Sequence, residues 1–480
     1  MIYLSVILVY LFALIAIGIV KSRKIHTQSD FALAGRTLTP WILVGTMLAS
    51  WIGTGSILGN AGKTYETGMA ALMLPIGSIL GIILLTRIAG KVRSYEKYTV
   101  PEIIGDRYGP VARNLSVFAL VMAYMVIVSY QYNAGGAVLY TVLADNTGTS
   151  IISIELATII AAVFIIAYTM LAGLLSVAYT DAANSIIMTL ALVISLPILW
   201  IKAGSWSGME TAFAAMNKSQ HMQFGGVYST MDIINFCLPP FLLVIGDANM
   251  YQRFSASKDV QSARYSTTIL VFAVLFIELL IIASSWVSSS MILEAEVGKH
   301  VLIYAAHQFL PTFLGAIMLT TIVGIIISTA DSFLLVPANT LIRDIYLNYI
   351  NPQASEKNIV RLSRLLVLLL GIIAYIVSIG FSRSAGFFER ALYAYTIYGA
   401  AITPALVAAL FWRGATKEGA VASIICGTLV TLFWKELPGL WFWLPTKWYI
   451  SLDEVLPAIS GSLLALIGVS YLTQKADPGK

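Results

Sequence analysis

The stretch MLASWIGTGSILGNAG, residues 47–62, indicates the fold most directly. It lies inside a long apolar segment that should form a membrane helix, yet it contains Gly53, Gly55, Gly59 and Gly62. A glycine in a helix interior costs about 1 kcal/mol relative to alanine. Within a bilayer, non-helical backbone is tolerated only where protein covers it or where it lines a cavity. The stretch therefore predicts a broken membrane helix that serves a site, with close helix packing through small residues as the alternative.

The composition of the whole chain is that of a membrane protein. Of its 480 residues, 58% are hydrophobic and 11% are charged, whereas soluble domains carry about 25% charged residues. Apolar segments long enough to cross a hydrocarbon core of about 30 Å recur along the chain. We predict an all-α polytopic membrane protein that forms a single domain over residues 1–480. Cys237 and Cys426 lie in apolar segments and indicate no disulfide framework.

The apolar segments predict thirteen membrane-spanning helices. They lie near residues 3–20, 40–61, 69–90, 110–143, 151–172, 178–201, 233–255, 266–292, 311–346, 359–381, 386–413, 417–435 and 453–473. The first segment has no positive residue before it and KSRK after it, which indicates a retained helix with its N-terminus outside and not a cleaved signal peptide.

This orientation places the C-terminus in the cytoplasm. The cytoplasmic loops and tail then hold 21 of the 29 Lys and Arg residues, in agreement with the positive-inside rule. The net charge of +5 therefore belongs to membrane loops and does not indicate a nucleic-acid partner. Short loops favour a bacterial inner membrane.

A second apolar segment, NFCLPPFLLVIGDANMYQR at 235–253, is also interrupted, first by Pro239 and Pro240 and then by Gly246 and Asp247. It comes five spans after the first broken segment, so the two segments should cross the membrane in opposite directions. Paired broken helices in inverted repeats are the best sequence indication of a transporter's binding site. The pairing favours a site at residues 47–62 over simple helix packing.

Three stretches carry a resemblance to a known family: ASWIGTGSILGNAG (49–62), AGLLSVAYTDAANS (172–185) and IISTADSFLLVPANTLIRDIY (326–346). With them, the chain resembles the sodium/solute symporter family over nearly all of its length. The resemblance implies a leucine-transporter-type core of five plus five helices in inverted repeat, with one helix before it and two after it. The parts would be the extra helix 3–20, the first repeat 40–201, the second repeat 233–413 and the two C-terminal helices within 417–473.

Ser328 and Thr329 place two adjacent hydroxyls in the middle of an apolar helix, where an unsatisfied hydroxyl is costly. A bond back to a carbonyl one turn earlier is the usual explanation of such a residue. A desolvated Na⁺, which needs several oxygen ligands, is the other explanation. The resemblance implies Na⁺ as the coupling ion, bound by the carbonyls of Ala49, Ile52 and Ile325 and by the hydroxyls of Ser328 and Thr329.

Ionisable residues within membrane spans are functional hypotheses by default. The resemblance matches Asp181 to an aspartate on the sodium exit path, while an N-cap of the helix 181–201 is the alternative. Asp331 could add negative field near the ion or pair with a basic residue of an inner loop. Glu278 has no obvious partner, and a protonated carboxyl facing a neighbouring helix is as plausible as a role in transport.

The expected solute site lies at the two helix breaks. Around Trp51 the chain is most similar to the choline-transporter branch of the family, in which this tryptophan forms one wall of an aromatic cage. That branch has further tryptophans where this chain has Asp247 and the run VSYQYNAGG (128–136). An aromatic face opposite a carboxylate attracts a primary or secondary ammonium group. The alternative is that Asp247 caps the half-helix that begins there. The expected solute contacts are Trp51, Ser56, Tyr130, Gln131, Asp247 and Tyr395.

These features predict a sodium-coupled symporter that imports a small organic solute, an amine or an amino-acid-like zwitterion, by alternating access. A neutral or carboxylate solute is the alternative substrate class. A transporter-derived solute sensor and a sodium-permeable channel are the other functions that remain open. No HExxH, GxSxG or P-loop motif occurs, so no enzyme is expected. The expected partners are the solute and the lipid bilayer, and the oligomeric state is not predicted.

Overall fold

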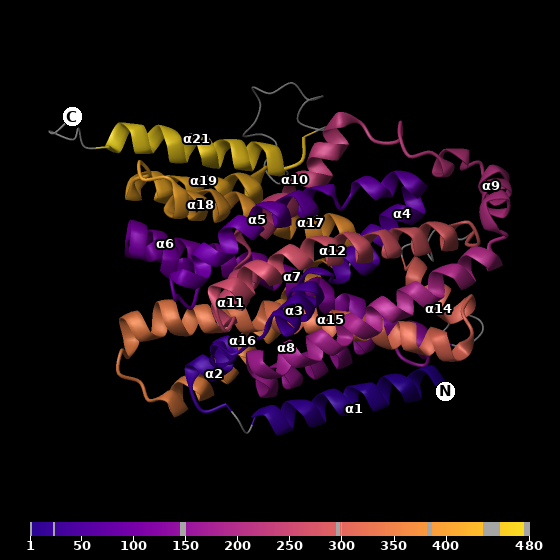
Figure 1. Ribbon diagram of the computed structural model, residues 1–480, viewed down its shortest axis with the longest axis horizontal. Helices are drawn as coiled ribbons and strands as arrows, with labels where there is room; N and C mark the ends of the chain where they lie inside the picture. Colours follow the sequence, from indigo (N-terminus) through magenta and orange to yellow (C-terminus); the bar gives the residue numbers. More distant parts are fainter. Residues whose placement is uncertain are drawn as a thin grey trace.

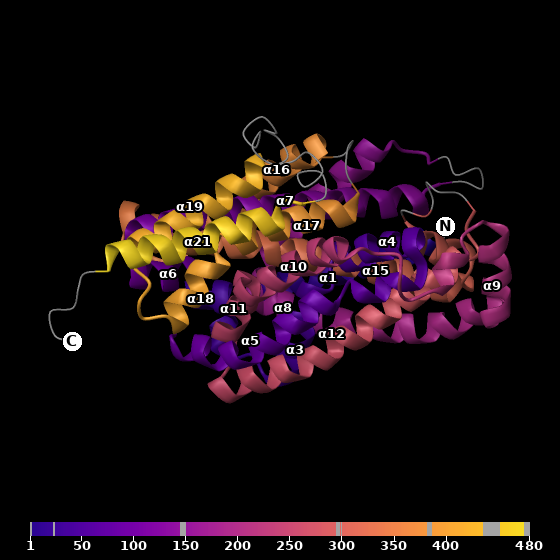
Figure 2. The ribbon, with the colours of Figure 1, turned by 90° about the horizontal axis from the view of Figure 1, so that it is seen from above.

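The computed structural model describes residues 2–22, 25–144, 150–293, 298, 300–381, 386–434 and 452–474. Nearly all of the elements in these residues are helices, as the composition predicts. Most of the long helices follow one long axis of the molecule (Figure 1). In both views the N-terminus and α9 (Ser205–Ala215) lie toward one end of this axis, and α6 (Val100–Tyr108) lies toward the other (Figures 1 and 2).

The helices that precede α10 include one very long, kinked element. They are α1 (Ile2–Ser22), α2 (Gln28–Leu33), α3 (Pro40–Trp51), α4 (Ala61–Thr67), α5 (Ile76–Ser94), α6, α7 (Pro110–Val142), α8 (Ile154–Lys202) and α9. The remaining α-helices are α10 (Thr230–Gly246), α11 (Ala248–Ala256), α12 (Val260–Ser289), α14 (Val301–Gln308), α15 (Thr312–Thr340), α16 (Glu356–Phe381), α17 (Phe387–Ala401), α18 (Thr403–Phe411), α19 (Lys417–Phe433) and α21 (Val455–Thr473). Short 3₁₀ or π segments are η1 (Ala34–Arg36), η2 (Gly55–Asn60), η3 (Gly68–Met73), η4 (Ser219–Met222) and η5 (Leu341–Ile350).

Both predicted helix breaks are confirmed. In the first, α3 ends at Trp51 and the π-helix η2 begins at Gly55, and the two halves are bent by 51°. In the second, α10 ends at Gly246 and α11 begins at Ala248, with Asp247 between them. The glycine signals therefore mark real interruptions, whereas the expected interruption at Pro239 and Pro240 is wrong, because both prolines lie inside the continuous helix α10.

Helix α8 is folded back on itself at Gly173, whose φ of 58° and ψ of 170° lie outside the helical region. The hydroxyls of Tyr168 and Thr180 lie 3.1 Å apart, whereas a straight helix would separate these residues by about 18 Å. The two arms of α8 therefore correspond to the expected spans 151–172 and 178–201. The N-cap interpretation of Asp181 is wrong, because the second arm is already helical when it reaches Asp181 and the turn lies at Gly173.

By length and composition, nine helices of the described residues can cross a membrane, and the bent pair that starts with α3 is a tenth candidate. The folded α8 is a single helix in this number although it has two arms. Helix α5 carries Arg87, Lys91 and Arg93, and α19 has only 17 residues. Each expected span thus contains helix, while thirteen crossings remain a prediction.

The broken helix lies at the centre of the packing. Helix α3 packs against both α8 and α12 and also contacts α15 and α11. Large apolar side chains are exposed on outward faces, for example Val163, Phe272 and Ile376, as expected for helices that face lipid. At the periphery α19 packs against α21, and α1 packs against α8 and α15. The polar residues of the two breaks are therefore enclosed by the bundle.

Candidate functional site

The first break frees backbone carbonyls from the helical hydrogen-bond ladder. The amide of Gly53 donates to the carbonyl of Trp51 (2.9 Å), and the amide of Ser56 donates to that of Gly53 (3.1 Å). In an unbroken helix these two amides would serve the carbonyls of Ala49 and Ile52, because each N–H pairs with the carbonyl four residues earlier. The carbonyls of Ala49 and Ile52 are thus available to another partner in a buried part of the molecule.

Helix α15 lies directly against this break. The hydroxyl of Thr329 donates to the carbonyl of Ala49 over 3.4 Å. A Cβ added at Gly53 would lie 2.9 Å from both Oγ1 and Cγ2 of Thr329, so the approach of the two segments requires glycine at this position. Ile325 lies one turn before Thr329 on the same helix and is buried. The structure therefore brings Ala49 and Thr329 of the expected sodium ligands into contact.

Ser328 has a different partner. Its hydroxyl donates to Oδ1 of Asp181 over 2.5 Å, and Oδ2 of Asp181 accepts from the hydroxyl of Thr46 over 2.6 Å. Asp181 is therefore tied both to the helix that carries the expected sodium hydroxyls and to the broken helix α3. Carbonyl and hydroxyl oxygens of this kind are ligands for a hard cation such as Na⁺.

Arg253 on α11 completes a buried polar network around Asp181. Its Nη2 lies 3.5 Å from Oδ2 of Asp181 and donates to Ser332 over 2.7 Å. Its Nε donates to Thr46 over 3.0 Å. The side chain of Arg253 has no solvent exposure. Sequence reasoning missed this residue, although an arginine inside an apolar span is rare and could have been flagged.

The second break is closed by its own hydrogen bonds. Oδ1 of Asp247 accepts from the hydroxyl of Tyr124 (2.5 Å) and from the amide of Asn249 (3.1 Å). The hydroxyl of Tyr398 donates to the carbonyl of Gly246 (2.7 Å) and accepts from the amide of Ala248 (3.2 Å). The alternative interpretation of Asp247, as the cap of the half-helix, is thus observed.

A pocket borders the first break, where Trp51, Gly55 and Ser56 contribute to its lining. Its walls come from α3, η2, α12, α17 and the segments around α5 and α10. Trp51 and Tyr395 are partly stacked, with ring centroids 6.4 Å apart and an interplanar angle of 26°. The lining residues are Trp51, Gly55, Ser56, Asn60, Leu74, Pro75, Ser78, Phe236, Pro240, Glu278, Phe388, Ala391, Leu392 and Tyr395. Asp247 is absent from this lining, so the expected pairing of Trp51 with Asp247 across one cavity is not seen.

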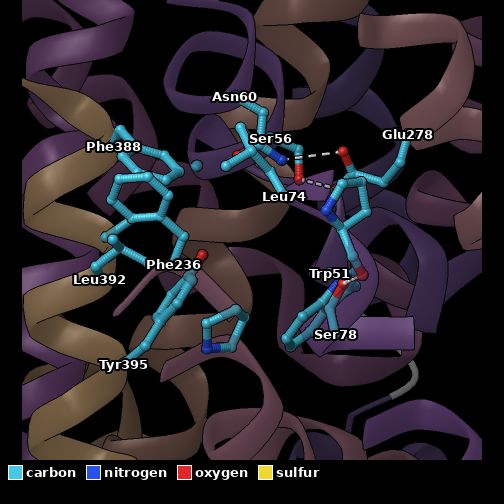
Figure 3. A pocket seen from close by; sticks show the side chains of 14 residues that line it. Trp51, Ser56, Asn60, Leu74, Ser78, Phe236, Glu278, Phe388, Leu392 and Tyr395 are labelled. Carbon is cyan, nitrogen blue, oxygen red and sulfur yellow. Dashed lines mark hydrogen bonds between the residues drawn. The ribbon is translucent and has the colours of Figure 1, made fainter. Parts of the chain in front are cut away.

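The carboxylate that lines the pocket is Glu278. Its Oε1 accepts from the hydroxyl of Ser56 over 2.6 Å, and its Oε2 accepts from Nδ2 of Asn60 over 3.1 Å. Figure 3 shows Ser56 and Asn60 both directed at this carboxylate, with the rings of Phe236, Phe388 and Tyr395 on the other side of the pocket. The spacing of Ser56 and Asn60 is a local signal for this arrangement, because residues four apart on a helix share a face. Asn60 was missed.

The remaining expected residues lie near the pocket without lining it. Tyr130 is buried and interacts with the side chain of Tyr395. Gln131 accepts a hydrogen bond from the hydroxyl of Thr54 in the first break, and its Nε2 is buried without a partner among the described residues. Both side chains therefore support segments that shape the pocket.

Asp331 accepts a hydrogen bond from Thr169. In the part of the chain that the structure describes, no Lys, Arg or His side chain forms an ion pair with Asp331. The expected alternative of a basic partner from an inner loop is not seen.

A family model and two relatives match most of the chain. The model of the sodium:solute symporter family matches residues 31–427. The sodium/proline symporter of Haemophilus influenzae is 26% identical over 98% of this chain and 94% of its own length. The high-affinity proline transporter PutP of Bacillus subtilis is 24% identical over 96% of each chain.

Solved transporter structures share the fold. A Na⁺-coupled sialic acid symporter in a substrate-bound outward-open state covers 99% of both chains with a TM-score of 0.81 and 15% identity. MhsT in complex with L-phenylalanine covers 90% of this chain and 97% of its own, with a TM-score of 0.57 and 11% identity. These likenesses confirm the expected leucine-transporter-type fold.

Proposed function

The chain belongs to the sodium:solute symporter family, and from this premise we propose that the solute it couples to Na⁺ is a small zwitterion with an amine, of the size of proline. Membership of the family makes the protein a multi-pass membrane transporter of a small solute with Na⁺ as its coupling ion, and not an enzyme. The proposal adds the chemical class of the solute and the path by which the two sites communicate.

One observation carries the proposal: a single break in the chain borders both candidate sites. The carbonyl of Ala49 faces Thr329 on α15, while Trp51 and Ser56, a few residues further along, line the pocket. An ion bound between the break and α15 would fix the backbone that positions Trp51 and Ser56. Binding of Na⁺ would then raise the affinity for solute by a coupling free energy that is reciprocal between the two sites.

The solute class is supported by the pocket and by the relatives. The pocket lies beside the first helix break. Its walls combine the rings of Trp51 and Tyr395 with one carboxylate, which suits an ammonium group attached to a compact apolar body. The relatives at 26% and 24% identity carry proline in their names.

We propose the topology that the charge distribution predicts. The N-terminus lies outside, the C-terminus lies in the cytoplasm, and the chain forms one domain with inverted repeats at 40–201 and 233–413. The membrane is a bacterial inner membrane. Toward the α9 end lies α4, which directly follows Asn60 of the pocket, and toward the α6 end lies α11 with Arg253 (Figures 1 and 2). In this topology the pocket is on the outer side and the Arg253 network closes the inner side.

The transport cycle follows from this arrangement. Na⁺ binds first and holds the broken helix against α15, solute then fills the pocket, and rearrangement of the bundle separates Arg253 from Asp181 and Ser332. Na⁺ leaves past Asp181. One positive charge moving inward releases about 2.3 kcal/mol per 100 mV. This free energy corresponds to roughly a fiftyfold accumulation of solute per ion, since about 1.4 kcal/mol is a factor of ten.

Uptake into proteoliposomes tests the proposal. We expect accumulation of L-proline or of another small zwitterionic amine under an inward Na⁺ gradient, saturation with solute, and loss of accumulation when K⁺ replaces Na⁺ or an ionophore dissipates the gradient. Na⁺ flux without solute saturation would indicate the channel. Sodium-dependent binding without uptake would indicate the sensor.

A further inference from the structure

We propose that Glu278 is the counter-charge for the ammonium group of the transported solute, and that this group is a primary or secondary ammonium. The inference rests on the proposed function and deepens it, because it assigns to α12 the recognition that the sequence suggested for Asp247. Glu278 is 2% exposed and lies within the otherwise apolar run 269–283 of α12. A residue of this kind needs a physical reason to be there, since charge inside a membrane is costly.

The pocket has a single charged side chain. Of the 14 residues that line it, Glu278 is the only Asp, Glu, Lys, Arg or His. The other lining groups are aromatic rings, prolines, aliphatic side chains, the hydroxyls of Ser56, Ser78 and Tyr395, and the amide of Asn60. Lys63, whose ammonium lies 5.6 Å from the centroid of the Phe236 ring, is ion-paired with Glu66. The charged group in the lining itself is therefore the carboxylate of Glu278, which attracts a cation.

The carboxylate is oriented by two hydrogen-bond donors and has no basic partner among the described residues. Ser56 and Asn60 each donate to a different oxygen of Glu278, so each oxygen keeps a lone pair for another donor. No basic side chain of the described residues is ion-paired with Glu278, and its side-chain hydrogen bonds come from Ser56 and Asn60. A buried charge without a counter-charge is unfavourable. A cationic solute would supply the missing partner.

The surroundings select the kind of cation. An ammonium group with N–H bonds can donate to the free lone pairs of the carboxylate, whereas a quaternary ammonium has no proton to donate. The rings of Trp51 and Tyr395 in the same pocket add cation–π attraction. The site therefore fits the ring nitrogen of a cyclic amino acid or a primary amine better than a choline-type group.

The position of Ser56 also links recognition to the ion. Ser56 belongs to η2, directly after the break that carries the carbonyls of Ala49 and Ile52. A solute that pairs with Glu278 would hold Ser56 and Asn60 in place through their bonds to the same carboxylate. Glu278 thus fixes η2 against α12 at the moment when the solute binds.

The test compares two probes of matched shape on purified protein in proteoliposomes. L-Proline carries a secondary ammonium in its ring, and tetrahydro-2-furoate has an ether oxygen at the same place. Glu278→Gln keeps the length of the side chain and removes the charge, and Glu278→Asp keeps the charge. Glu210→Gln, on the exposed surface of α9, is the matched control for loss of one negative charge. Na⁺-dependent thermal stabilisation of the solute-free protein shows that each variant is folded and binds the ion.

We expect wild type and Glu210→Gln to take up L-proline with the same half-saturation concentration and to discriminate against tetrahydro-2-furoate. In Glu278→Gln this concentration should rise at least about thirtyfold, the lower end of the loss when one partner of a buried charge pair is removed. Glu278→Asp should recover part of the loss, and the stabilisation by Na⁺ should not change.

Two results would overturn the assignment while sodium-coupled symport stands. In the first, Glu278→Gln takes up L-proline with the same half-saturation concentration as the wild type. In the second, the wild type takes up tetrahydro-2-furoate as well as it takes up L-proline, again in a sodium-dependent way. Absence of sodium-dependent uptake of both probes by the wild type would overturn the proposed amine substrate together with the role of Glu278.

Discussion

Oδ1 of Asp181 accepts a hydrogen bond of 2.5 Å from the hydroxyl of Ser328. The other oxygen of the same carboxylate lies 2.6 Å from the hydroxyl of Thr46 and 3.5 Å from Nη2 of Arg253. One side chain therefore touches both the helix proposed to hold Na⁺ and the arginine proposed to close the inner side. A change in the occupancy of the ion site would reach Arg253 through a single carboxylate.

Loss of the Thr329 hydroxyl should weaken Na⁺ activation of uptake. Thr329→Val keeps the shape of the side chain but removes an oxygen that lies 3.4 Å from the carbonyl of Ala49. We expect the Na⁺ concentration for half-maximal uptake to rise about tenfold, the effect of about 1.4 kcal/mol of lost binding. Thr329→Ser retains the oxygen and should stay close to wild type. Equal Na⁺ dependence of Val and Ser variants would place the ion elsewhere.

A methyl group at Gly53 should separate the broken helix from α15. The added Cβ would lie 2.9 Å from Oγ1 of Thr329, which is too close for an unstrained contact, so the backbone must move. We expect Gly53→Ala to weaken Na⁺-dependent stabilisation and uptake together. Gly225→Ala is the control, because a Cβ there meets nothing within 4 Å. Wild-type Na⁺ dependence of Gly53→Ala would argue against ion binding between these segments.

The pair Arg253–Asp181 should contribute to stability as a unit. Removal of one partner of a buried ion pair typically costs about 3–5 kcal/mol, since the other charge is left alone. Arg253→Met and Asp181→Asn should each lower the thermal midpoint of the purified protein, and the double variant should lose less than the sum. Lys258→Met is the control, because the Lys258–Asp259 pair is about half exposed at 3.9 Å and should be worth about 0–1 kcal/mol. Additive losses would mean that the pair is not coupled.

The breaks could be predicted from the sequence because their causes are local. Glycine at residues 53 and 55 and the Gly246-Asp247 pair weaken a helix wherever the chain later folds. The same reasoning identified Asp247 as a possible cap, since capping depends on neighbours in sequence. The turn at Gly173 falls in the gap between the expected spans 151–172 and 178–201, where a single glycine with positive φ is enough to reverse the chain.

Most of the solute pocket could not be predicted, because it depends on contacts between distant segments. Ser56 and Glu278 are 222 positions apart in the chain, and no local pattern fixes which face of α12 turns toward η2. Trp51 and Tyr395 were both expected in the site, yet their ring contact also arises only from packing. Asp247 and Glu278 are both acidic residues inside apolar spans, and only the fold distinguishes the one that caps a helix from the one that lines a pocket.

Cysteine labelling should establish the orientation in the membrane. In a background with Cys237 and Cys426 replaced, Lys258→Cys lies on the surface between α11 and α12, and Gln223→Cys lies on the surface between α9 and α10. A membrane-impermeant maleimide should label position 223 from outside intact cells and position 258 only after the cells are opened. The opposite pattern would invert the topology and would place the pocket on the cytoplasmic side.

Asp247→Asn should affect stability more than transport. The carboxylate is 1% exposed and accepts from Tyr124 and from the amide of Asn249. Asparagine is nearly as good an N-cap as aspartate, but hydrogen bonds to a charged acceptor are worth about 1.5–3 kcal/mol and those to a neutral one about 0.5–1.5 kcal/mol.

We therefore expect a lower thermal midpoint for Asp247→Asn, with a half-saturation concentration for L-proline close to that of wild type. Tyr124→Phe removes the hydroxyl that donates to the same carboxylate and should destabilise the protein in the same direction. Two measurements thus distinguish the roles of the two residues. Glu278→Gln should change the affinity for solute, and Asp247→Asn should change the thermal stability. A rise in the half-saturation concentration for Asp247→Asn as large as that for Glu278→Gln would return Asp247 to the solute site. In that case the second helix break, and not α12 alone, would supply the charge that recognises the amine.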